Sequence, residues 1–491
     1  MWRNRVIAII ITFMLIAGCY ASCYATSLPD AQFEAIQSLL DDACHISGVP
    51  GMSVSIIRGD YVFFFSSGCA DKGKELPTDE TTLYELASVS KAFTGAGILL
   101  LEELGQLSMT DSIQEYLPWF TLKYQGMSVD MQSLTLNHFL YHSSGLTNGK
   151  HFASIPQGNT QDMLRNTVEV FVDAELAFAP SEKYDYGTMN YDVLGLVIET
   201  VSGQNYESFM VEQVLEPLGL YNTYLYEADA QATGHLAQGY RSSFFITTPY
   251  NAPDYAGNKP AGYIISSAWD MARWMGIQMG MIHDIPEIFQ SIIAKSHVGN
   301  TSVQDVNGLY YAAGWEVNSD RTLIQHGGGN PNFRSNVIMF PEEQLAICLL
   351  SNGANTNRDL VKNIKSFLDG NHMQSYRMDF TQLLDIILSC AALITVTLTI
   401  MFFLMGLRRK KCGNPQPLTK KRITIICFWL IITVAVCVMC WISPAFFGGD
   451  WAYTFVWLTY SLPTASILLV ILSASITWFV YAKRYKAVSH K

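Results

Sequence analysis

The sequence is poor in charged residues. Of its 491 residues, 15% are Asp, Glu, Lys or Arg and 49% are hydrophobic, and polar residues become scarce after Thr381. The chain is also longer than one compact core usually carries. We therefore expect a large folded region in water followed by a region in a different solvent. The net charge of -11 makes nucleic acid an unsuitable partner.

Cysteines are too few and too unevenly placed to form a disulfide framework. Of the ten, five lie in the apolar C-terminal region and two in the N-terminal segment, which leaves Cys44, Cys69 and Cys348. A bridge between Cys44 and Cys69 is conceivable, whereas Cys348 lies in an apolar run and is expected to be a core thiol. The spacing fits no zinc site, so we expect neither a metal nor another cofactor.

The N-terminus has the features of an export signal. Arg3 and Arg5 precede an uncharged apolar run and then small residues, which predicts a signal over residues 1–25. The residues up to Cys19 also fit a lipoprotein signal, in which Cys19 would carry a lipid. Cleavage after Ala25, lipidation and an uncleaved anchor remain open alternatives. Each places the bulk of the chain outside the cytoplasm.

Three apolar stretches near the C-terminus predict membrane spans, at 386–407, 423–442 and 457–481. Each has about the ~20 residues needed to cross a ~30 Å hydrocarbon core, so the lipid bilayer is an expected partner. The loop 408–422 and the tail 482–491 are rich in Lys and Arg. The positive-inside rule places both in the cytoplasm, which predicts a multi-pass protein of the plasma or inner membrane.

The exported region, 29–370, is separated from the membrane by a polar linker, 371–385, and has strand patterns at both ends. Near its start we predict a helix, two strands and a buried helix, over 32–43, 52–57, 61–66 and 90–107. Near its end we predict four strands and a helix, over 310–317, 322–326, 335–340, 344–350 and 358–368. This order favours an α+β fold, with one antiparallel sheet built from distant segments, flanking helices and a helical insertion.

Ser88 and Lys91 form an S-x-x-K tetrad at the predicted start of a helix. A spacing of three residues puts the hydroxyl and the amine on the same helix face. A lysine can accept the serine proton near neutral pH only if its pKa falls from ~10.4 to about 7–8. Burial and the positive helix N-terminus both lower the pKa of a lysine. Because such tetrads also occur by chance, the hypothesis needs support from other motifs.

Two further segments provide that support. Residues 179–195 are rich in tyrosine and lead into an apolar helix, and residues 325–335 contain three consecutive glycines after a strand. Residues without side chains allow a substrate backbone to lie against a strand edge. The glycines do not form a phosphate loop, because no Gly-Lys-Ser/Thr follows. The alternative is a simple glycine turn between strands.

Taken together, these motifs resemble those of the β-lactamase-related serine hydrolases, which include class C β-lactamases, D-alanyl-D-alanine carboxypeptidases, D-aminopeptidases and esterases. The resemblance covers about residues 30–368 and implies a β-lactamase/penicillin-binding-protein-like fold. It implies that Tyr186 is the catalytic tyrosine beside Lys91, and that the neighbouring tyrosines only pack. It also implies that His142 is structural.

In the same family, the position of the K-T-G signature is taken here by His326, Gly327 and Gly328. The resemblance implies that this strand binds the substrate. It also implies an oxyanion hole formed by the backbone N–H groups of Ser88 and Gly329.

Within this group the sequence is most similar to prodrug-activating peptidases of the colibactin-maturing type. They share the three spans and the Asn-Pro-Asn-Phe motif that begins at Asn330. Such peptidases remove an N-acyl-D-asparagine cap from an exported peptide. Thr188 stands where most of the superfamily has Asn, and these peptidases also have a small hydroxyl residue at this position. Asn330, with help from Thr188, could bind a polar D-side chain, although a turn asparagine is the alternative. Lys259 lies in another plausible pocket loop.

The leading hypothesis is therefore a membrane-anchored serine peptidase or amidase that acts on an N-acyl-D-Asn type peptide through an acyl-enzyme. A D,D-carboxypeptidase or cell-wall esterase is a second hypothesis, so the substrate is a peptide or a cell-wall-derived small molecule. A non-catalytic sensor of β-lactams or peptidoglycan that uses the same cleft is the third.

Overall fold

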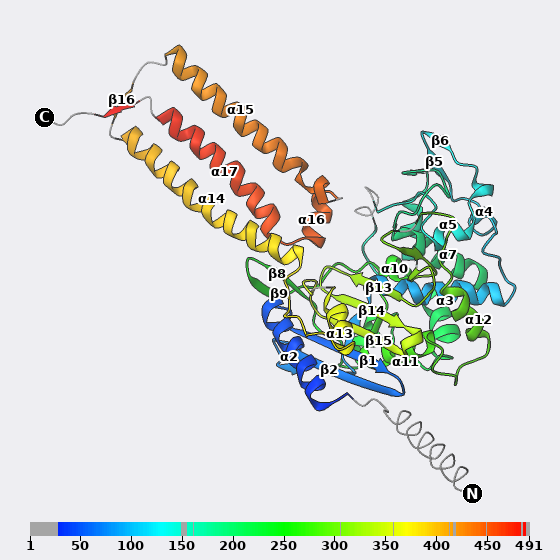
Figure 1. The fold of residues 1–491 in the computed structure, drawn as a ribbon. Helices are drawn as coiled ribbons and strands as arrows, with labels where there is room; N and C mark the ends of the chain where they lie inside the picture. Colours follow the sequence, from blue (N-terminus) through cyan, green and yellow to red (C-terminus); the bar gives the residue numbers. More distant parts are fainter. Residues whose placement is uncertain are drawn as a thin grey trace, which may run out of the picture.

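The computed structural model describes residues 28–148, 155–160, 162–304, 306–356, 358–411, 413–415, 419–447, 449–482 and 485–487. The export signal expected over 1–25 lies outside this part of the chain. The described residues form a large α+β domain and a group of long C-terminal helices that extends from one side of it (Figure 1).

The domain is built on an antiparallel sheet of eight strands, in the order β11-β12-β13-β14-β15-β1-β2-β3. The strands are β1 (Gly51–Arg58), β2 (Tyr61–Asp71), β3 (Leu76–Pro77), β11 (Leu309–Tyr311), β12 (Glu316–Asn318), β13 (Ile324–Gly329), β14 (Arg334–Phe340) and β15 (Leu345–Ser351). Strand β1 pairs with β15 from Met52 and Ser351 to Arg58 and Leu345, so the two ends of the domain meet at the centre of the sheet. This confirms the predicted sheet of distant segments.

One strand prediction was wrong. The stretch 310–317 forms two short strands, β11 and β12, which pair with each other on either side of a turn. Gly314 in that turn has a φ of 79°, a conformation that favours glycine. A Cβ atom at Gly314 would overlap the backbone of Lys91 and Ala92. The turn therefore lets the edge of the sheet touch the helix that begins beside Ser88.

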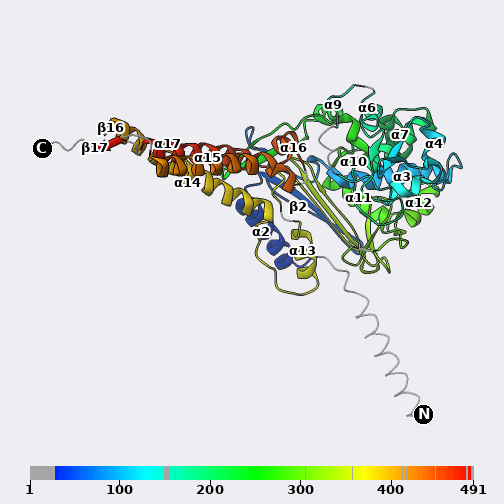
Figure 2. The ribbon, with the colours of Figure 1, turned by 90° about the horizontal axis from the view of Figure 1, so that it is seen from above.

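Helices cover both faces of the sheet (Figure 2). On one face, α2 (Asp30–Ser47) and α13 (Leu360–Leu368) bury Ile36, Leu40 and Ile364 against the sheet. On the other face lies the predicted insertion, with a larger hydrophobic core. Strand β1 is buried along almost its whole length because both faces are covered.

The insertion contains most of the remaining elements. Its longer helices are α3 (Ser90–Glu103), α6 (Met163–Glu169), α7 (Met189–Ser202), α11 (Ala268–Gln278) and α12 (Ile288–Ser296). Its shorter helices are α4 (Ile113–Tyr116), α5 (Leu136–Leu140), α8 (Tyr206–Met210), α9 (Glu227–Ala232) and α10 (Lys259–Gly262). Its short strands are β4 (Leu83–Glu85), β5 (Leu122–Tyr124), β6 (Met127–Ser128), β7 (Ala174–Glu175), β8 (Tyr240–Ser243), β9 (Ile246–Pro249) and β10 (Ile265–Ser267).

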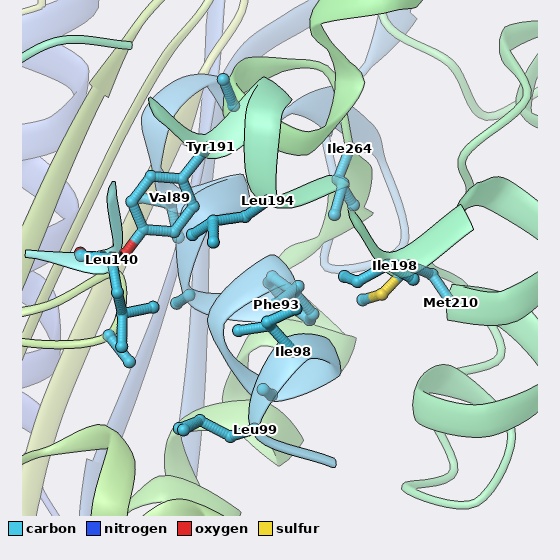
Figure 3. Packing of buried hydrophobic residues seen from close by; sticks show 14 of the residues in the cluster. Val89, Phe93, Ile98, Leu99, Leu140, Tyr191, Leu194, Ile198, Met210 and Ile264 are labelled. Atoms are coloured by element: carbon cyan, nitrogen blue, oxygen red, sulfur yellow. Dashed lines mark hydrogen bonds between the residues drawn. The ribbon is translucent and has the colours of Figure 1, made fainter. Parts of the chain in front are cut away.

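Helix α3 passes through the centre of this core. Its residues from Ser90 to Leu101 are all buried, as expected for a helix that is apolar on every side. The Phe93 ring stacks on Trp274 with 4.4 Å between ring centroids, and Leu194 and Ile198 of α7 pack nearby (Figure 3). Because interiors are close-packed, the first turn of α3 has little freedom to move.

The C-terminal region contains α14 (Phe380–Lys411), α15 (Lys420–Ile442), α16 (Trp451–Trp457) and α17 (Ser461–Ala482), with a short pair of strands, β16 (Gly413–Pro415) and β17 (Tyr485–Ala487). Three of these helices, α14, α15 and α17, are long and apolar enough to cross a membrane. Helix α14 begins within the stretch expected to be linker, and the third long helix begins at Ser461 rather than 457. Residue 457 instead belongs to the short helix α16.

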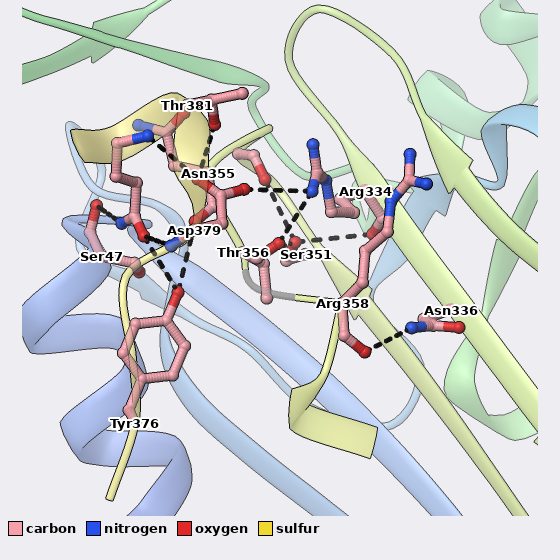
Figure 4. Close-up of polar contacts among 12 residues, drawn as sticks. Ser47, Arg334, Asn336, Ser351, Asn355, Thr356, Arg358, Tyr376, Asp379 and Thr381 are labelled. Atoms are coloured by element: carbon pink, nitrogen blue, oxygen red, sulfur yellow. Dashed lines mark hydrogen bonds and ion pairs between the residues drawn. The ribbon is translucent and has the colours of Figure 1, made fainter. Parts of the chain in front are cut away.

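Polar contacts tie the start of α14 to the sheet (Figure 4). The Asp379 carboxylate accepts the backbone N–H of Gln382 at 2.9 Å, which caps the helix. The same carboxylate lies 3.4 Å from the Arg334 guanidinium of β14. The Gln382 amide donates to the carbonyl of Ser47, at the end of α2, at 3.3 Å. The segment expected to be a polar linker is thus attached to the domain.

The cysteines of the domain are free. Cys44 and Cys69 are not bridged, so the conceivable disulfide is not formed in the structure. Cys348 is buried in β15, in agreement with the prediction of a core thiol.

Candidate active site

Ser88 lies in a tight turn, η1 (Ala87–Val89), between β4 and α3. Ala87 has a φ of 47°, in the left-handed region that residues with a Cβ atom rarely adopt. Leu86 donates its backbone N–H to the carbonyl of Ile264 at 2.8 Å, which fixes the turn to β10 and its neighbours. Strained backbone of this kind is characteristic of functional sites.

The Lys91 ammonium group is buried in the first turn of α3. Its Nζ atom lies 2.6 Å from the Ala261 carbonyl, 3.0 Å from the Thr188 hydroxyl and 3.4 Å from the Ser88 hydroxyl. Burial lowers the pKa of Lys91, and the charge of the buried Asp192 carboxylate opposes that shift. Lys91 therefore meets the two requirements for accepting a serine proton, proximity and a lowered pKa.

Tyr186 lies in the loop before α7, close to Lys91. The Lys91 Nζ atom lies 5.0 Å from the centroid of the Tyr186 ring. The Tyr186 hydroxyl is buried, and within the described part of the chain it has no hydrogen bond of regular geometry. Burial raises the pKa of Tyr186, and interaction with the Ser88 hydroxyl opposes the rise. The phenol thus sits beside both members of the tetrad.

The neighbouring tyrosines pack, as the sequence analysis expected. The Tyr191 hydroxyl donates to the Leu140 carbonyl at 3.0 Å in the core. The Tyr184 ring stacks on Tyr311 with centroids 5.7 Å apart. Neither tyrosine lines the cavity that contains Ser88.

His142 is held in a structural position. It is fully buried, with a φ of 54°, and its Nδ1 atom lies 3.0 Å from the side-chain amide of Asn190 and 3.4 Å from the backbone nitrogen of Gly187. Its ring packs 4.4 Å from that of Tyr186. His142 therefore supports the loop that carries Tyr186 and does not line the cavity.

The three glycines lie at the end of β13 and not in a turn, because β13 runs to Gly329. A Cβ atom at Gly328 would collide with the Ser335 hydroxyl, the Leu86 carbonyl and the Ala87 side chain. The strand can approach the serine turn only because position 328 lacks a side chain. His326 is buried, and its Nε2 atom lies 3.1 Å from the Tyr311 hydroxyl. Its ring faces Tyr186 at 6.2 Å.

Gly327 and Gly329 are less crowded than Gly328. The nearest atoms to a Cβ at Gly327 belong to Arg358, at 3.9 Å. A Cβ at Gly329 would lie 3.7 Å from the Arg358 guanidinium and 4.0 Å from that of Arg334. Two cationic groups therefore stand beside the end of the strand, on β14 and just after β15 (Figure 4).

Thr188 connects the lysine to a loop on the opposite wall. Its hydroxyl accepts from Lys91, and its backbone N–H donates to the Asn148 side-chain carbonyl at 2.7 Å. Thr188 is buried directly before α7 and still borders the cavity. A β-branched hydroxyl here serves as an acceptor for the lysine, a role that an apolar residue could not fill.

Asn330 is buried beside the cavity, and its side-chain nitrogen is already bound. It donates to the Glu85 carboxyl at 2.5 Å and to the Gly262 carbonyl at 3.0 Å. Burial raises the pKa of Glu85 to about 8, although the bond from Asn330 opposes the shift. Within the described residues, the Asn330 Oδ1 atom has no hydrogen bond. This oxygen is the atom of Asn330 that remains able to accept from a ligand.

Some of these residues border one cavity of about 610 Å³, whereas Lys91, His326, Gly327 and Gly328 lie behind its lining. It is bordered by Ser88, Thr147, Asn148, Asp185, Tyr186, Thr188, Asn258, Ala261, Gly262, Gly329, Asn330, Arg358, Tyr453 and Trp457. Lys259 does not border it, because its ammonium group lies 2.7 Å from Glu207 in a separate cavity. The cavity is large enough for a peptide-sized ligand with Ser88 in its wall.

The fold and motif geometry agree with the sequence comparison. Residues 36–369 match the family model described as "Beta-lactamase". The chain belongs to the β-lactamase family. It is therefore a member of a family of serine hydrolases related to penicillin-binding proteins and D-alanine carboxypeptidases.

Individual relatives are distant. The protein flp of Staphylococcus aureus (strain MW2) is 26% identical over 89% of this chain and 88% of its own length. Penicillin-binding protein 4* of Bacillus subtilis (strain 168) is 27% identical, over 60% of this chain and 66% of its own. The structure of a D-alanine carboxypeptidase from Burkholderia cenocepacia superposes with a TM-score of 0.59 at 22% identity, covering 70% of this chain and 99% of the other.

Sequence reasoning missed part of the cavity wall. Asn148 and Arg358 border it, but neither belongs to a tetrad or a glycine motif. Trp457 is the first residue of the third predicted span and Tyr453 lies in the loop before it, so neither was expected at the site. The aromatic character of the segment 451–457, between two apolar spans, is the one signal that could have marked it.

Proposed function

We propose that the chain is a membrane-anchored serine hydrolase that cleaves an amide bond outside the cytoplasm through an acyl-enzyme on Ser88. The observation that carries the proposal is the buried Lys91 amine, 3.4 Å from the Ser88 hydroxyl, with the Tyr186 ring 5.0 Å away. A nucleophile and a base within reach of each other, with a third group that orients them, are what covalent catalysis by serine requires.

In the first half-reaction, the Ser88 oxygen attacks the amide carbonyl carbon while its proton passes to the Lys91 amine, directly or through Tyr186. The C–N bond then breaks, the proton is returned to the leaving amine, and the acyl group remains as an ester on Ser88. In the second half-reaction, water attacks this ester and the same groups move its proton back to Ser88. A neutral Lys91 is needed at the start, and burial favours that form.

The developing negative charge on the carbonyl oxygen would be stabilised by the backbone N–H groups of Ser88 and Gly329. The strand formed by His326, Gly327 and Gly328 would pair with an extended substrate backbone. The close contact of Gly328 with the Ser88 turn supports this arrangement, because it keeps strand and nucleophile together.

For the substrate we propose a peptide amide with a D-residue, of the N-acyl-D-Asn type. Asn330 and Thr188 both border the cavity, and the free Oδ1 atom of Asn330 and the hydroxyl of Thr188 suit a carboxamide side chain, which offers N–H donors and an acceptor. Asn148 on the opposite wall could add a further polar contact.

A D,D-carboxypeptidase is the second candidate, favoured by one observation. Arg358 borders the cavity and its guanidinium has no ion pair within the described residues, so it could bind the terminal carboxylate of a D-alanyl-D-alanine peptide. Substituting Arg358→Gln separates the candidates. It should weaken hydrolysis of the carboxylate-bearing peptide far more than that of an uncharged amide.

The positive loop between α14 and α15 supports a cytoplasmic location for that loop, and hence an external domain.

A sensor would share the acylation step but would release the acyl group slowly. Steady turnover of the substrate therefore argues against a sensor, while stoichiometric acylation without turnover argues for it.

The experiment is a comparison of full-length wild type, Ser88→Ala and Lys91→Met in detergent micelles. A fluorophosphonate probe should label wild type, and Ser88→Ala should not be labelled at all. An N-acyl-D-Asn anilide and an acyl-D-alanyl-D-alanine peptide are then compared as substrates. Labelling of Ser88→Ala at the wild-type rate would show that Ser88 is not the nucleophile.

A further inference from the structure

The candidate active-site cavity is not formed by the α+β domain alone. Tyr453 and Trp457, which border it, belong to α16, the short helix between the second and third long apolar helices. They lie one helical turn apart, so both rings are on the same face of α16. Helix α16 stands at the end of the helix group nearest to the domain (Figures 1 and 2).

Arg241 of β8 holds α16 against the domain. Its guanidinium is buried and lies over two rings, 3.7 Å from the centroid of Tyr250 and 4.8 Å from that of Tyr460. The same group donates to the backbone carbonyl of Phe455 at 2.9 Å. Arg241 therefore connects the domain to both the helix and the residue that precedes α17. A planar guanidinium can stack and donate in this way, whereas an ammonium group cannot.

Other contacts surround Arg241 and fix the same segment. The Tyr250 hydroxyl donates to the carbonyl of Val456 at 3.4 Å, and the backbone N–H of Tyr460 donates to the Ser243 hydroxyl at 2.9 Å. The Val456 side chain packs against the main hydrophobic core of the domain. These bonds come from β8 and from Tyr250, just after β9, which lie far from α16 in the sequence.

We propose that α16 is a wall of the substrate cleft, and that Tyr453 and Trp457 determine specificity by contacting an apolar or aromatic group of the substrate. This inference rests on the proposed function of Ser88. Tyr and Trp offer large apolar faces with a polar edge, which complements a cleft whose wall also includes Asn, Thr, Asp and Arg side chains. Arg241 acts as a positioning residue, because it touches α16 and does not border the cavity.

The proposal gives the membrane region a role beyond anchoring. A substrate must fit between the serine turn and a helix that is continuous with two apolar spans, so the cleft is complete only in the full chain. A small reagent that needs only Ser88 and Lys91 should not depend on α16. A substrate with a large apolar group next to the scissile amide should depend on it strongly.

The test uses the full-length protein in detergent micelles or nanodiscs. We compare Trp457→Ala and Tyr453→Ala with Trp441→Ala, which removes an exposed ring at the end of α15 outside the cavity. Substrates are a matched pair of amides with either an acetyl or a phenylacetyl group. Loss of the apolar contact should raise KM for the phenylacetyl amide by about ten-fold in Trp457→Ala, with kcat and the acetyl amide nearly unchanged.

Labelling of Ser88 by a small fluorophosphonate distinguishes failure of the α16 role from failure of the proposed function. If wild type is labelled but Trp457→Ala and Tyr453→Ala treat both amides as wild type does, the role of α16 is refuted while the proposed function stands. If wild type is neither labelled nor active, the proposed function fails and this inference fails with it. Arg241→Ala should resemble Trp457→Ala in its KM, whereas Arg241→Lys should not restore the wild-type value.

A second measurement does not depend on turnover. The introduced thiol of a Trp457→Cys variant should react with a water-soluble maleimide more slowly after Ser88 has been modified by a bulky fluorophosphonate. The thiol of Trp441→Cys should react at the same rate before and after. Equal rates at position 457 would show that a group on Ser88 does not reach α16.

Discussion

Replacing Thr188 by valine offers the sharpest test of how the Lys91 base is tuned. Valine keeps the branched shape but lacks the hydroxyl that accepts from the Lys91 ammonium at 3.0 Å. That hydroxyl stabilises the charged form of Lys91, because only the ammonium has an additional proton to donate. Its removal leaves the Ala261 carbonyl at 2.6 Å and the Ser88 hydroxyl at 3.4 Å as acceptors.

The size of the effect follows from the energy of one hydrogen bond to a buried charge. Such bonds contribute about 1.5–3 kcal/mol, and one pKa unit corresponds to about 1.4 kcal/mol. The pKa of Lys91 should therefore fall by about 1–2 units in Thr188→Val. Since the reaction needs the neutral amine, the acid limb of the kcat/KM profile should move to lower pH by the same amount.

The assay is the pH dependence of Ser88 acylation by a small fluorophosphonate, which avoids differences in substrate binding. Thr200→Val is the matched control, because Thr200 lies on α7, the helix that Thr188 precedes, and within the described residues its hydroxyl bonds only to the Leu196 carbonyl. Its profile should be that of wild type. If the acid limb of Thr188→Val stays in place or moves to higher pH, Lys91 is not the group that titrates.

Three further predictions follow from the same site. Asp192→Asn removes the carboxylate that raises the pKa of Lys91, so the acid limb should again move to lower pH; a shift to higher pH would contradict the assigned sign. Gly328→Ala should lower the free energy of unfolding by about 1–3 kcal/mol and reduce acylation of Ser88, because the added Cβ atom collides with the Ser88 turn. Gly327→Ala is the control: its Cβ atom would have no neighbour nearer than 3.9 Å, so its thermal unfolding should be that of wild type. Burial raises the pKa of Glu85 to about 8, above the value of about 4.3 in the unfolded chain. The protonated carboxyl therefore stabilises the folded state below about pH 4.3, and this contribution to the free energy of unfolding is lost as the pH rises towards 8. Glu85→Gln should lack that loss, and the difference in Tm between variant and wild type should grow over this range; a constant difference would argue against it.

Two groups of contacts attach the apolar C-terminal helices to the α+β domain. Arg241, Tyr250 and Tyr460 hold α16 at the cavity, and Asp379 and Gln382 fix the start of α14 to the sheet. Both attachments lie on the side of the domain from which the long helices extend (Figure 1). The domain and its apolar helices therefore share an interface, and the candidate active site borders it.

Several elements of the fold and the serine motif could be predicted from local pattern. Runs of β-branched, aromatic and apolar residues between turns predicted β1, β2, β14 and β15, and helical spacing predicted α3, each within about five residues. The three apolar stretches were visible for the same reason. The S-x-x-K tetrad could be found because a spacing of three on a helix already brings two side chains together.

Contacts between groups that are distant in the chain could not be predicted in this way. No local pattern indicates that Thr188 and Ala261 would both accept from Lys91, that Glu85 would bind Asn330, or that Gly314 would split one predicted strand into two. Each depends on the packing of segments far apart in the chain, as does the position of Trp457 in the wall of the cavity. The sequence gives the chemistry of each side chain, but contacts between residues far apart in the chain form only when the hydrophobic core packs.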